Sequence, residues 1–141
     1  MLEEYFSCRS KPMKSFLDPL RQSGAPPLVL TNTRNDRVVA DTLLRAFDSA
    51  SRRQGLLKRD YLPEGSALVI APTSAIHTFF MRFAIDVAFV ARDGRVLKVR
   101  RAMPPWRMAA AWRAFAVVEM SAGALDRAGV QAGDVVRIDA I

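Results

Sequence analysis

The sequence has little of what most metal sites and covalent scaffolds require. It contains one cysteine and one histidine in 141 residues, which excludes a disulfide framework, paired-cysteine zinc sites and the HExxH zinc motif. No apolar run approaches the roughly 18 residues that a membrane-spanning helix needs. No block of five like charges occurs either, so the sequence has no basic arm. Charged residues interrupt residues 1–27, so no export signal is visible and we expect a cytoplasmic protein.

What the sequence does have is the composition of one globular domain. Half of its residues are hydrophobic and a quarter are charged, and a chain of this length can bury a substantial core. The formal net charge of +7 is compatible with nucleic acid, acidic ligands or anionic surfaces, or with a simply basic protein. We predict an irregular leader over residues 1–27, closed by Pro26 and Pro27, and a single domain over residues 28–141.

Short strands dominate the predicted secondary structure. Residues 87–91 are apolar on both faces, which is typical of a central strand. Asp93-Gly94 follows directly and predicts a hairpin in which both turn positions have positive φ. The strands with predicted bounds are 28–31, 67–71, 87–91, 95–101 and 135–138, and the predicted order of elements is strand, helix, five strands, helix and strand.

Two helices are predicted from apolar spacing and from end signals. The first covers residues 38–53, with Asp36 as its N-cap and Gly55 just beyond its end. The second covers residues 121–129, with Ser121 as its cap and Gly129 as its last residue. Residues 108–118 stay open, because their alanines favour helix and the run from Phe115 favours strand.

Several short motifs occur together in a fixed order. They are RQGLLKRD (53–60), HTFFMRFAID (77–86), DGRV (93–96), VEMSAG (118–123) and GD (133–134). Residues 28–141 thereby resemble domain-of-unknown-function family 192. The resemblance implies a compact, β-dominated α+β domain, with a curved, largely antiparallel sheet or partial barrel and two short helices, and it implies no activity.

This sequence departs from the family pattern at two points. Many members carry an export signal, which is not visible here. Members also commonly have Trp and Asn around the central methionine, whereas this sequence has Phe80, Arg82 and Phe83. Roles tied to that Trp or Asn therefore do not carry over to this chain.

Two acids occur inside apolar segments that read as strands. Asp86 lies between Ile85 and Val87, and Glu119 follows Val118. A buried carboxylate is costly unless it is paired, so each is a structural ion pair or a site residue with a shifted pKa. Arg59 and Arg82 are the expected partners.

His77 is the only side chain that titrates near neutral pH without perturbation. The simpler interpretation is a hydrogen-bonded core histidine. The alternative is that His77 lines a pocket with Met81, Asp86 and Glu119. A copper site of His77, Met81 and a third ligand such as Met103 or Met108 is a weaker alternative, and no metal or cofactor is predicted.

We therefore expect a non-catalytic binding module with a cleft for a small polar or anionic ligand. Its candidate binding residues are His77, Met81, Arg82, Asp86, Glu119 and Arg59. The alternative is a hydrolase that uses Asp86 and Glu119 together with His77. Cys8 lies in the leader and is given no role.

A basic and aromatic surface supplies a second alternative, which is nucleic-acid binding. Arginine beside exposed tryptophan can hold phosphate and stack bases. The competing interpretation is a solvated basic face with packed tryptophans, and the oligomeric state is not determined by the sequence. The candidate residues are Arg100, Arg101, Trp106, Arg107, Trp112 and Arg113.

Overall fold

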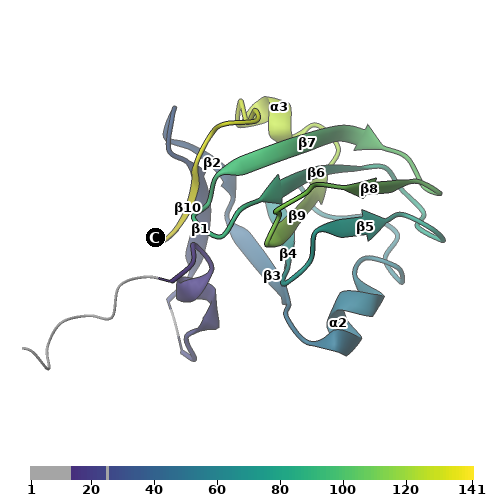
Figure 1. Cartoon of the computed structure of the whole chain (residues 1–141), viewed down its shortest axis with the longest axis horizontal. Helices are drawn as coiled ribbons and strands as arrows, with labels where there is room; N and C mark the ends of the chain where they lie inside the picture. The colour runs from purple at the N-terminus through teal and green to yellow at the C-terminus, as the bar shows by residue number, and fades with distance from the viewer. Residues whose placement is uncertain (1–13, 25) are drawn as a thin grey trace, which may run out of the picture.

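β-Strands form most of the protein. The computed structural model describes residues 14–24 and 26–141 (Figure 1). Its helical elements are the 3-10 helix η1 (Asp18–Arg21) and the short helices α2 (Ser49–Gln54) and α3 (Ala124–Arg127). The strands are β1 (Leu28–Asn32), β2 (Arg37–Ala40), β3 (Thr42–Ala46), β4 (Ser66–Ile70), β5 (Ala75–His77), β6 (Ile85–Val90), β7 (Val96–Met103), β8 (Met108–Ala110), β9 (Ala116–Ser121) and β10 (Val136–Ala140).

The strands form three sheets of different size. The largest has the order β3-β4-β9-β6-β7, and a smaller one has the order β10-β1-β2. Strands β5 and β8 form a two-stranded ribbon. All pairs are antiparallel except β3 with β4. The expectation of a β-dominated α+β fold with curved, unclosed sheets and two short helices is confirmed.

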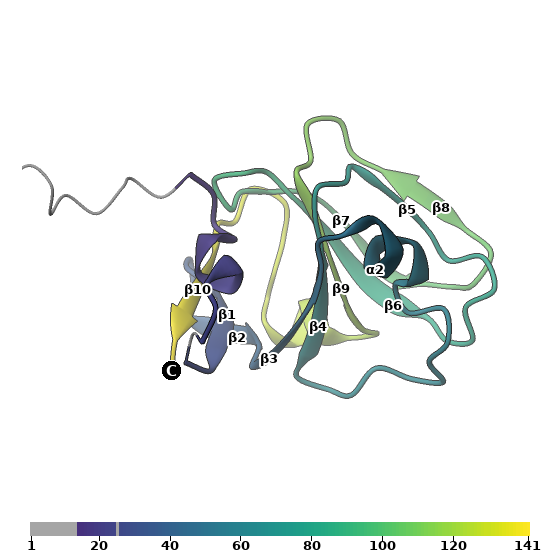
Figure 2. The same ribbon diagram turned by 90° about the horizontal axis from the view of Figure 1, so that it is seen from below.

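The central strands β4, β9 and β6 of the five-stranded sheet are buried on both faces. The small sheet lies on one side of it, and the β5–β8 ribbon lies with α2 on the other (Figure 2). Alternate residues of β6 therefore enter different clusters, with Ala88 and Val90 facing the small sheet and Val87 and Phe89 facing the ribbon. This double burial explains why the strand lacks polar alternation, and it confirms the predicted central strand.

The predicted helix over residues 38–53 is wrong. The chain instead forms β2 and β3, followed by the six residues of α2. Leu43 packs against the cluster on one face of the sheet and Leu44 against the cluster on the other, which is the alternation of a strand. Asp36 is no cap, because its φ is 58°. The N-cap is Asp48, whose side chain accepts a hydrogen bond from the Ser51 amide at 2.8 Å.

The predicted hairpin is present, but its turn differs from the prediction. The Gly94 amide donates to the Ala91 carbonyl at 3.0 Å, and only Gly94 of the two turn residues has a positive φ. The second predicted helix is shorter than expected, because Ser121 belongs to β9 and Gly123 caps α3. Gly129, at φ 60°, follows the helix end as expected.

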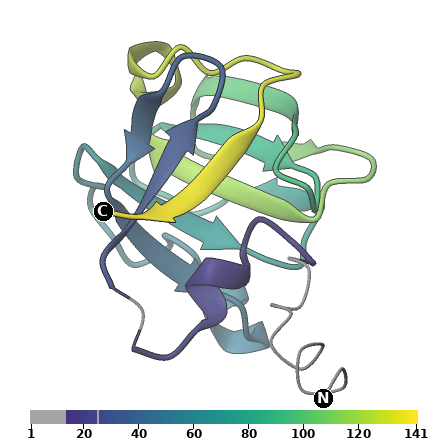
Figure 3. The ribbon, with the colours of Figure 1, turned by 90° about the vertical axis from the view of Figure 1, so that its left-hand side faces the viewer.

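Part of the predicted leader contributes to the core. Phe16, Leu17 and Leu20 are buried in the cluster between the large and small sheets. Figure 3 shows η1 beside the small sheet, in front of the large sheet. Cys8 lies outside the described residues.

Candidate functional site

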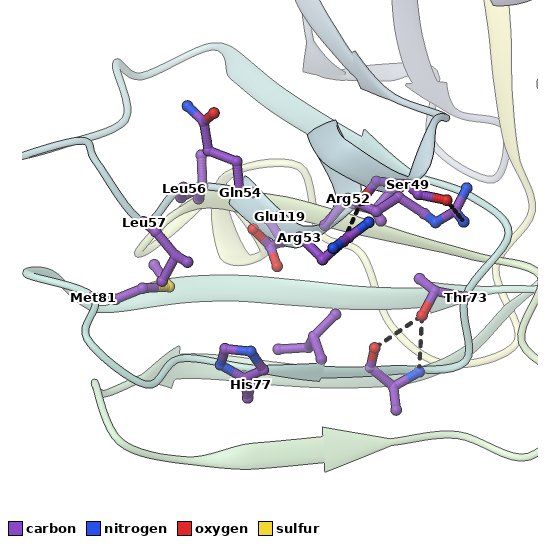
Figure 4. Close-up of a pocket in the computed structure, with 14 residues that line it drawn as sticks. Ser49, Arg52, Arg53, Gln54, Leu56, Leu57, Thr73, His77, Met81 and Glu119 are labelled. Carbon is purple, nitrogen blue, oxygen red and sulfur yellow. Dashed lines mark hydrogen bonds between the residues drawn. The ribbon is translucent and has the colours of Figure 1, made fainter.

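A pocket of about 420 Å³ opens on the ribbon side of the large sheet. Helix α2 and the turn after it form one wall, β5 forms the opposite wall, and β9 supplies the floor (Figure 4). The apolar lining consists of Leu56, Leu57, Ile70, Ile76 and Met81. The polar lining includes Arg52, Arg53, Gln54, Thr73, His77 and Glu119. The lining is therefore mixed, with polar side chains at least as prominent as apolar ones, and placed polar groups are what orient a ligand in a small-molecule site.

Glu119 is the buried acid of this pocket. Its residue is 4% exposed, and Figure 4 shows its carboxylate directed into the cavity. Within the described part of the chain, the carboxylate makes no hydrogen bond and no ion pair. Burial raises the pKa of Glu119 to about 7, so both protonation states are populated near neutral pH.

Asp86 is on the opposite face of the sheet. In the β6–β9 pairing Asp86 is opposite Met120, whereas Glu119 is opposite Val87. The Asp86 carboxylate accepts backbone hydrogen bonds from Ala102 at 2.8 Å, Gly123 at 3.1 Å and Leu125 at 3.0 Å. The predicted convergence therefore holds for His77 and Glu119 but not for Asp86.

This placement removes the basis of the hydrolase alternative. Among the described residues that line the pocket, Glu119 is the only carboxylic acid. The oxygens of Asp86 accept hydrogen bonds from three backbone amides, which is typical of a buried acid that stabilises the fold. The two carboxylates do not share a cavity, so they cannot act together as acid and base on one substrate.

His77 is an exposed residue at the pocket wall, so the core-histidine interpretation is wrong. Its Nδ1 accepts a hydrogen bond from the Phe79 amide at 3.2 Å. Its ring stacks on the Phe79 ring with the centroids 5.0 Å apart. Ala75 and His77 are both exposed on β5 and Ile76 between them is half-buried, so an apolar-looking segment leaves His77 open to solvent.

The predicted arginine partners do not reach the two acids. Arg82 forms an exposed ion pair with Asp60 instead. Arg59 is exposed and is not among the residues that line the pocket. Met81 does line the cavity, as predicted.

The arginines of the pocket come from α2 and were missed by sequence reasoning. Arg52 donates to the Phe47 carbonyl at 2.8 Å, and Arg53 donates to the Ser49 carbonyl at 3.3 Å. Neither forms an ion pair with a carboxylate of the described chain. Their signal in the sequence is an adjacent basic pair that ends up in the last turn of the six-residue helix α2.

The described residues contain no group of three or more His, Cys, Asp or Glu side chains that could hold a metal ion. The two methionines proposed as a third copper ligand lie in different places relative to His77. Met103 is buried in the core, and Met108 is exposed on the strand opposite His77. Among the helices of residues 14–24 and 26–141, none is long and apolar enough to cross a membrane.

The predicted basic and aromatic surface is divided by the fold. Arg101 turns toward α3, where it pairs with Asp126 at 2.8 Å and donates to the Val130 carbonyl. Trp106 and Arg107 lie before β8, whereas Trp112 and Arg113 lie beyond its other end. Trp112 is 88% exposed, so it is not a core residue. Trp106 is 56% exposed and packs against Phe79 and Phe80 of the neighbouring loop.

Comparison with known proteins gives a family and two solved relatives of the fold. The DUF192 family, described as "Uncharacterized ACR", matches residues 30–138. A protein of unknown function from Novosphingobium aromaticivorans is 23% identical, with a TM-score of 0.68 over 83% of this chain and 89% of its own. A proposed transcription regulator from Sinorhizobium meliloti is 21% identical, with a TM-score of 0.68 over 78% and 90%. No curated protein matches the chain.

Proposed function

The chain belongs to the DUF192 family, whose description names no activity, and we propose that it is a binding module for a small polar or anionic ligand. The observation that carries the proposal is Glu119, an acid at the floor of a 420 Å³ pocket without a partner in the described chain. A buried polar group is costly unless it is hydrogen-bonded. The described residues contain no fully buried side-chain oxygen without a partner, so the Glu119 oxygens are open to the pocket and a ligand there can bond to them.

The charge of the pocket wall favours a ligand with an anionic group. Arg52 and Arg53 add positive charge without a paired carboxylate in the described residues. Glu119 is compatible with an anion, because a carboxyl group with a pKa of about 7 can donate its proton to a ligand oxygen. The apolar lining from Leu56, Leu57 and Met81 would hold the ligand's uncharged part.

Native mass spectrometry of protein purified at low salt tests this proposal. We expect an additional mass on the wild type and on Glu64→Ala, an exposed acid outside the pocket. The mass should be lost from Glu119→Ala and from Arg53→Ala. Thermal melting with inorganic phosphate and with short carboxylates covers the case of a ligand lost during purification.

Two results would contradict the proposed anion site. An unliganded mass, combined with no stabilisation of the wild type by phosphate or carboxylates, would argue against an anion site. An additional mass that survives in Glu119→Ala would place the ligand elsewhere on the protein.

A further inference from the structure

Aromatic rings form an exposed ledge beyond the β5–β8 ribbon. Phe79 and Trp106 stack with their centroids 5.9 Å apart, and Phe80 packs against Trp106 at 4.6 Å. We call these three residues the aromatic ledge. Phe80 is 71% exposed and Trp106 is 56% exposed. The loops that carry them continue from the end of β5 and into the start of β8 at the edge of the molecule (Figure 1).

A single buried threonine holds the two loops of the ledge together. The Thr78 hydroxyl donates to the Pro104 carbonyl at 2.7 Å and accepts from the Arg107 amide at 3.0 Å. Its carbonyl accepts from the amides of Trp106 and Met81, and its amide donates to the Arg107 carbonyl at 2.8 Å. The ledge is therefore fixed by hydrogen bonds before any partner binds, which lowers the entropy cost of binding.

The backbone of the ledge is in an unfavourable conformation. Phe80 has a φ of 64° and Trp106 a φ of 67°, a region that bulky side chains rarely adopt. Such conformations persist where the surroundings impose them, and they cluster at binding and active sites. Here the result is that two large rings stay open to solvent instead of turning into the core.

The surroundings of the ledge are basic. Residues 95–118 contain six arginines or lysines and no acid. Arg107 follows Trp106 directly, and among the described residues its guanidinium has only the Trp106 carbonyl as a partner. Lys98 and Arg100 lie on the face of β7 that also carries the contact with β8. Positive charge thus runs along β7 toward the ledge.

We propose that the aromatic ledge binds single-stranded nucleic acid, with bases stacking on Trp106 and Phe80 and phosphates contacting Arg107 and Arg100. Exposed rings on a basic surface are the combination that such proteins use, and stacking tolerates any base. The charge favours a phosphate-bearing partner over a neutral sugar. The rings partly cover one another, so the exposed parts of Phe80 and Trp106 are where bases would stack.

Fluorescence anisotropy with labelled oligothymidylate and oligouridylate tests the proposal. We expect Trp106→Ala and Phe80→Ala each to weaken binding about tenfold, the effect of losing one stacked base. Trp112→Ala is the control, since Trp112 is the other exposed tryptophan and lies at the far end of β8, and it should change affinity less than twofold. In Arg107→Ala the slope of log affinity against log salt should fall by about 0.7.

Three results would overturn the proposal. One is equal loss of affinity in Trp112→Ala and Trp106→Ala, which indicates non-specific contacts. Another is the absence of oligonucleotide binding at low salt. The third is binding to phosphatidylglycerol vesicles without binding to oligonucleotides, which makes the surface a membrane contact. Glu119→Gln should bind oligonucleotides like the wild type, so this test is independent of the pocket.

Discussion

Asp86 and Glu119 lie on neighbouring strands of one sheet and face opposite sides of it. Asp86 is opposite Met120 and Glu119 is opposite Val87 in the β6–β9 pairing. Both acids are buried, but their carboxylates have different surroundings. The Asp86 carboxylate accepts hydrogen bonds from three backbone amides, whereas the Glu119 carboxylate faces a cavity. One carboxylate therefore stabilises the fold, whereas the other is available to a ligand.

The structural role of Asp86 predicts a large loss of stability on its removal. Asp86→Ala leaves the amides of Ala102, Gly123 and Leu125 without their acceptor. We expect the free energy of unfolding to fall by about 3 kcal/mol, since hydrogen bonds to a buried charge are strong. Urea denaturation measures this. In Asp126→Ala, which removes an exposed ion pair with Arg101, the loss should stay below about 1 kcal/mol.

Similar stability of Asp86→Ala and the wild type would contradict the structural role. The same holds if Asp86→Ala and Asp126→Ala lose equal amounts, because burial would then add nothing to the contribution of the acid.

Glu119 predicts a pH dependence of the opposite sign to that of ordinary acids. Its pKa rises from 4.5 to about 7 on folding, so the folded state binds the proton more tightly. The carboxylate then carries no penalty below pH 4.5, and it destabilises the protein as the pH rises through 7. We expect Glu119→Gln to gain up to about 3 kcal/mol over the wild type between pH 5 and pH 8.

Urea denaturation at several pH values measures that difference, and the exposed acid in Glu64→Gln is the control. Other acids contribute to the profile of both proteins. Asp134, for example, has its pKa lowered mainly by the hydrogen bond from Arg34. Comparison with Glu119→Gln cancels these contributions. Parallel profiles for wild type and Glu119→Gln would show that Glu119 titrates like an exposed acid.

Local sequence was sufficient to predict the centre of the fold. The apolar run of β6 and the Asp93-Gly94 turn specify a buried strand and its hairpin without reference to distant residues. The helix over residues 38–53 failed for a non-local reason. Its apolar positions fit a helical period, but β3 pairs in parallel with β4 across a connection that sequence spacing does not reveal.

The site was predicted in part, for a related reason. Apolar neighbours correctly marked Glu119 and Asp86 as buried acids. Whether two acids share a face depends on the register between β6 and β9, and a shift of one residue would reverse the answer. The pocket arginines Arg52 and Arg53 were missed because they were assigned to a long helix over residues 38–53, whereas they belong to the short helix α2 beside the pocket.

A side chain added at Gly94 should cause a steric clash as well as backbone strain, and Gly133 allows the two effects to be separated. Gly94 and Gly133 both have a φ of 95°, but a Cβ on Gly94 would collide with the Val136 carbonyl, whereas Gly133 faces open space. The close approach at Gly94 is real, because its carbonyl accepts the Val136 amide at 2.9 Å.

We expect Gly133→Ala to cost about 1–2 kcal/mol for its conformation alone. Gly94→Ala should cost about 3 kcal/mol or more, because β10 must also move away from the hairpin. Urea denaturation of the two variants measures the difference. Equal costs would mean that β10 yields to the added methyl group and that only backbone strain matters at either position.

The buried hydroxyl of Thr78 should keep the aromatic ledge ordered. Thr78→Val keeps the shape of the side chain but removes the bonds to Pro104 and Arg107. We expect a loss of about 2 kcal/mol and a looser packing of Trp106. In a Trp112→Phe background, Trp106 is the only tryptophan of the chain, so its emission should shift to longer wavelength and be quenched more by acrylamide.

The matched control for this prediction is Thr73→Val, which loses an exposed hydroxyl contact with the Ala75 carbonyl. Thr73 lies before β5, whereas the ledge loop follows the other end of that strand, so tryptophan emission should not change in that variant. If Thr78→Val instead preserves both stability and emission, the ring contacts of Phe79 and Phe80 are enough to hold Trp106. Weaker oligonucleotide binding by Thr78→Val, with Trp106 and Arg107 intact, would then require a cause other than loss of order in the ledge.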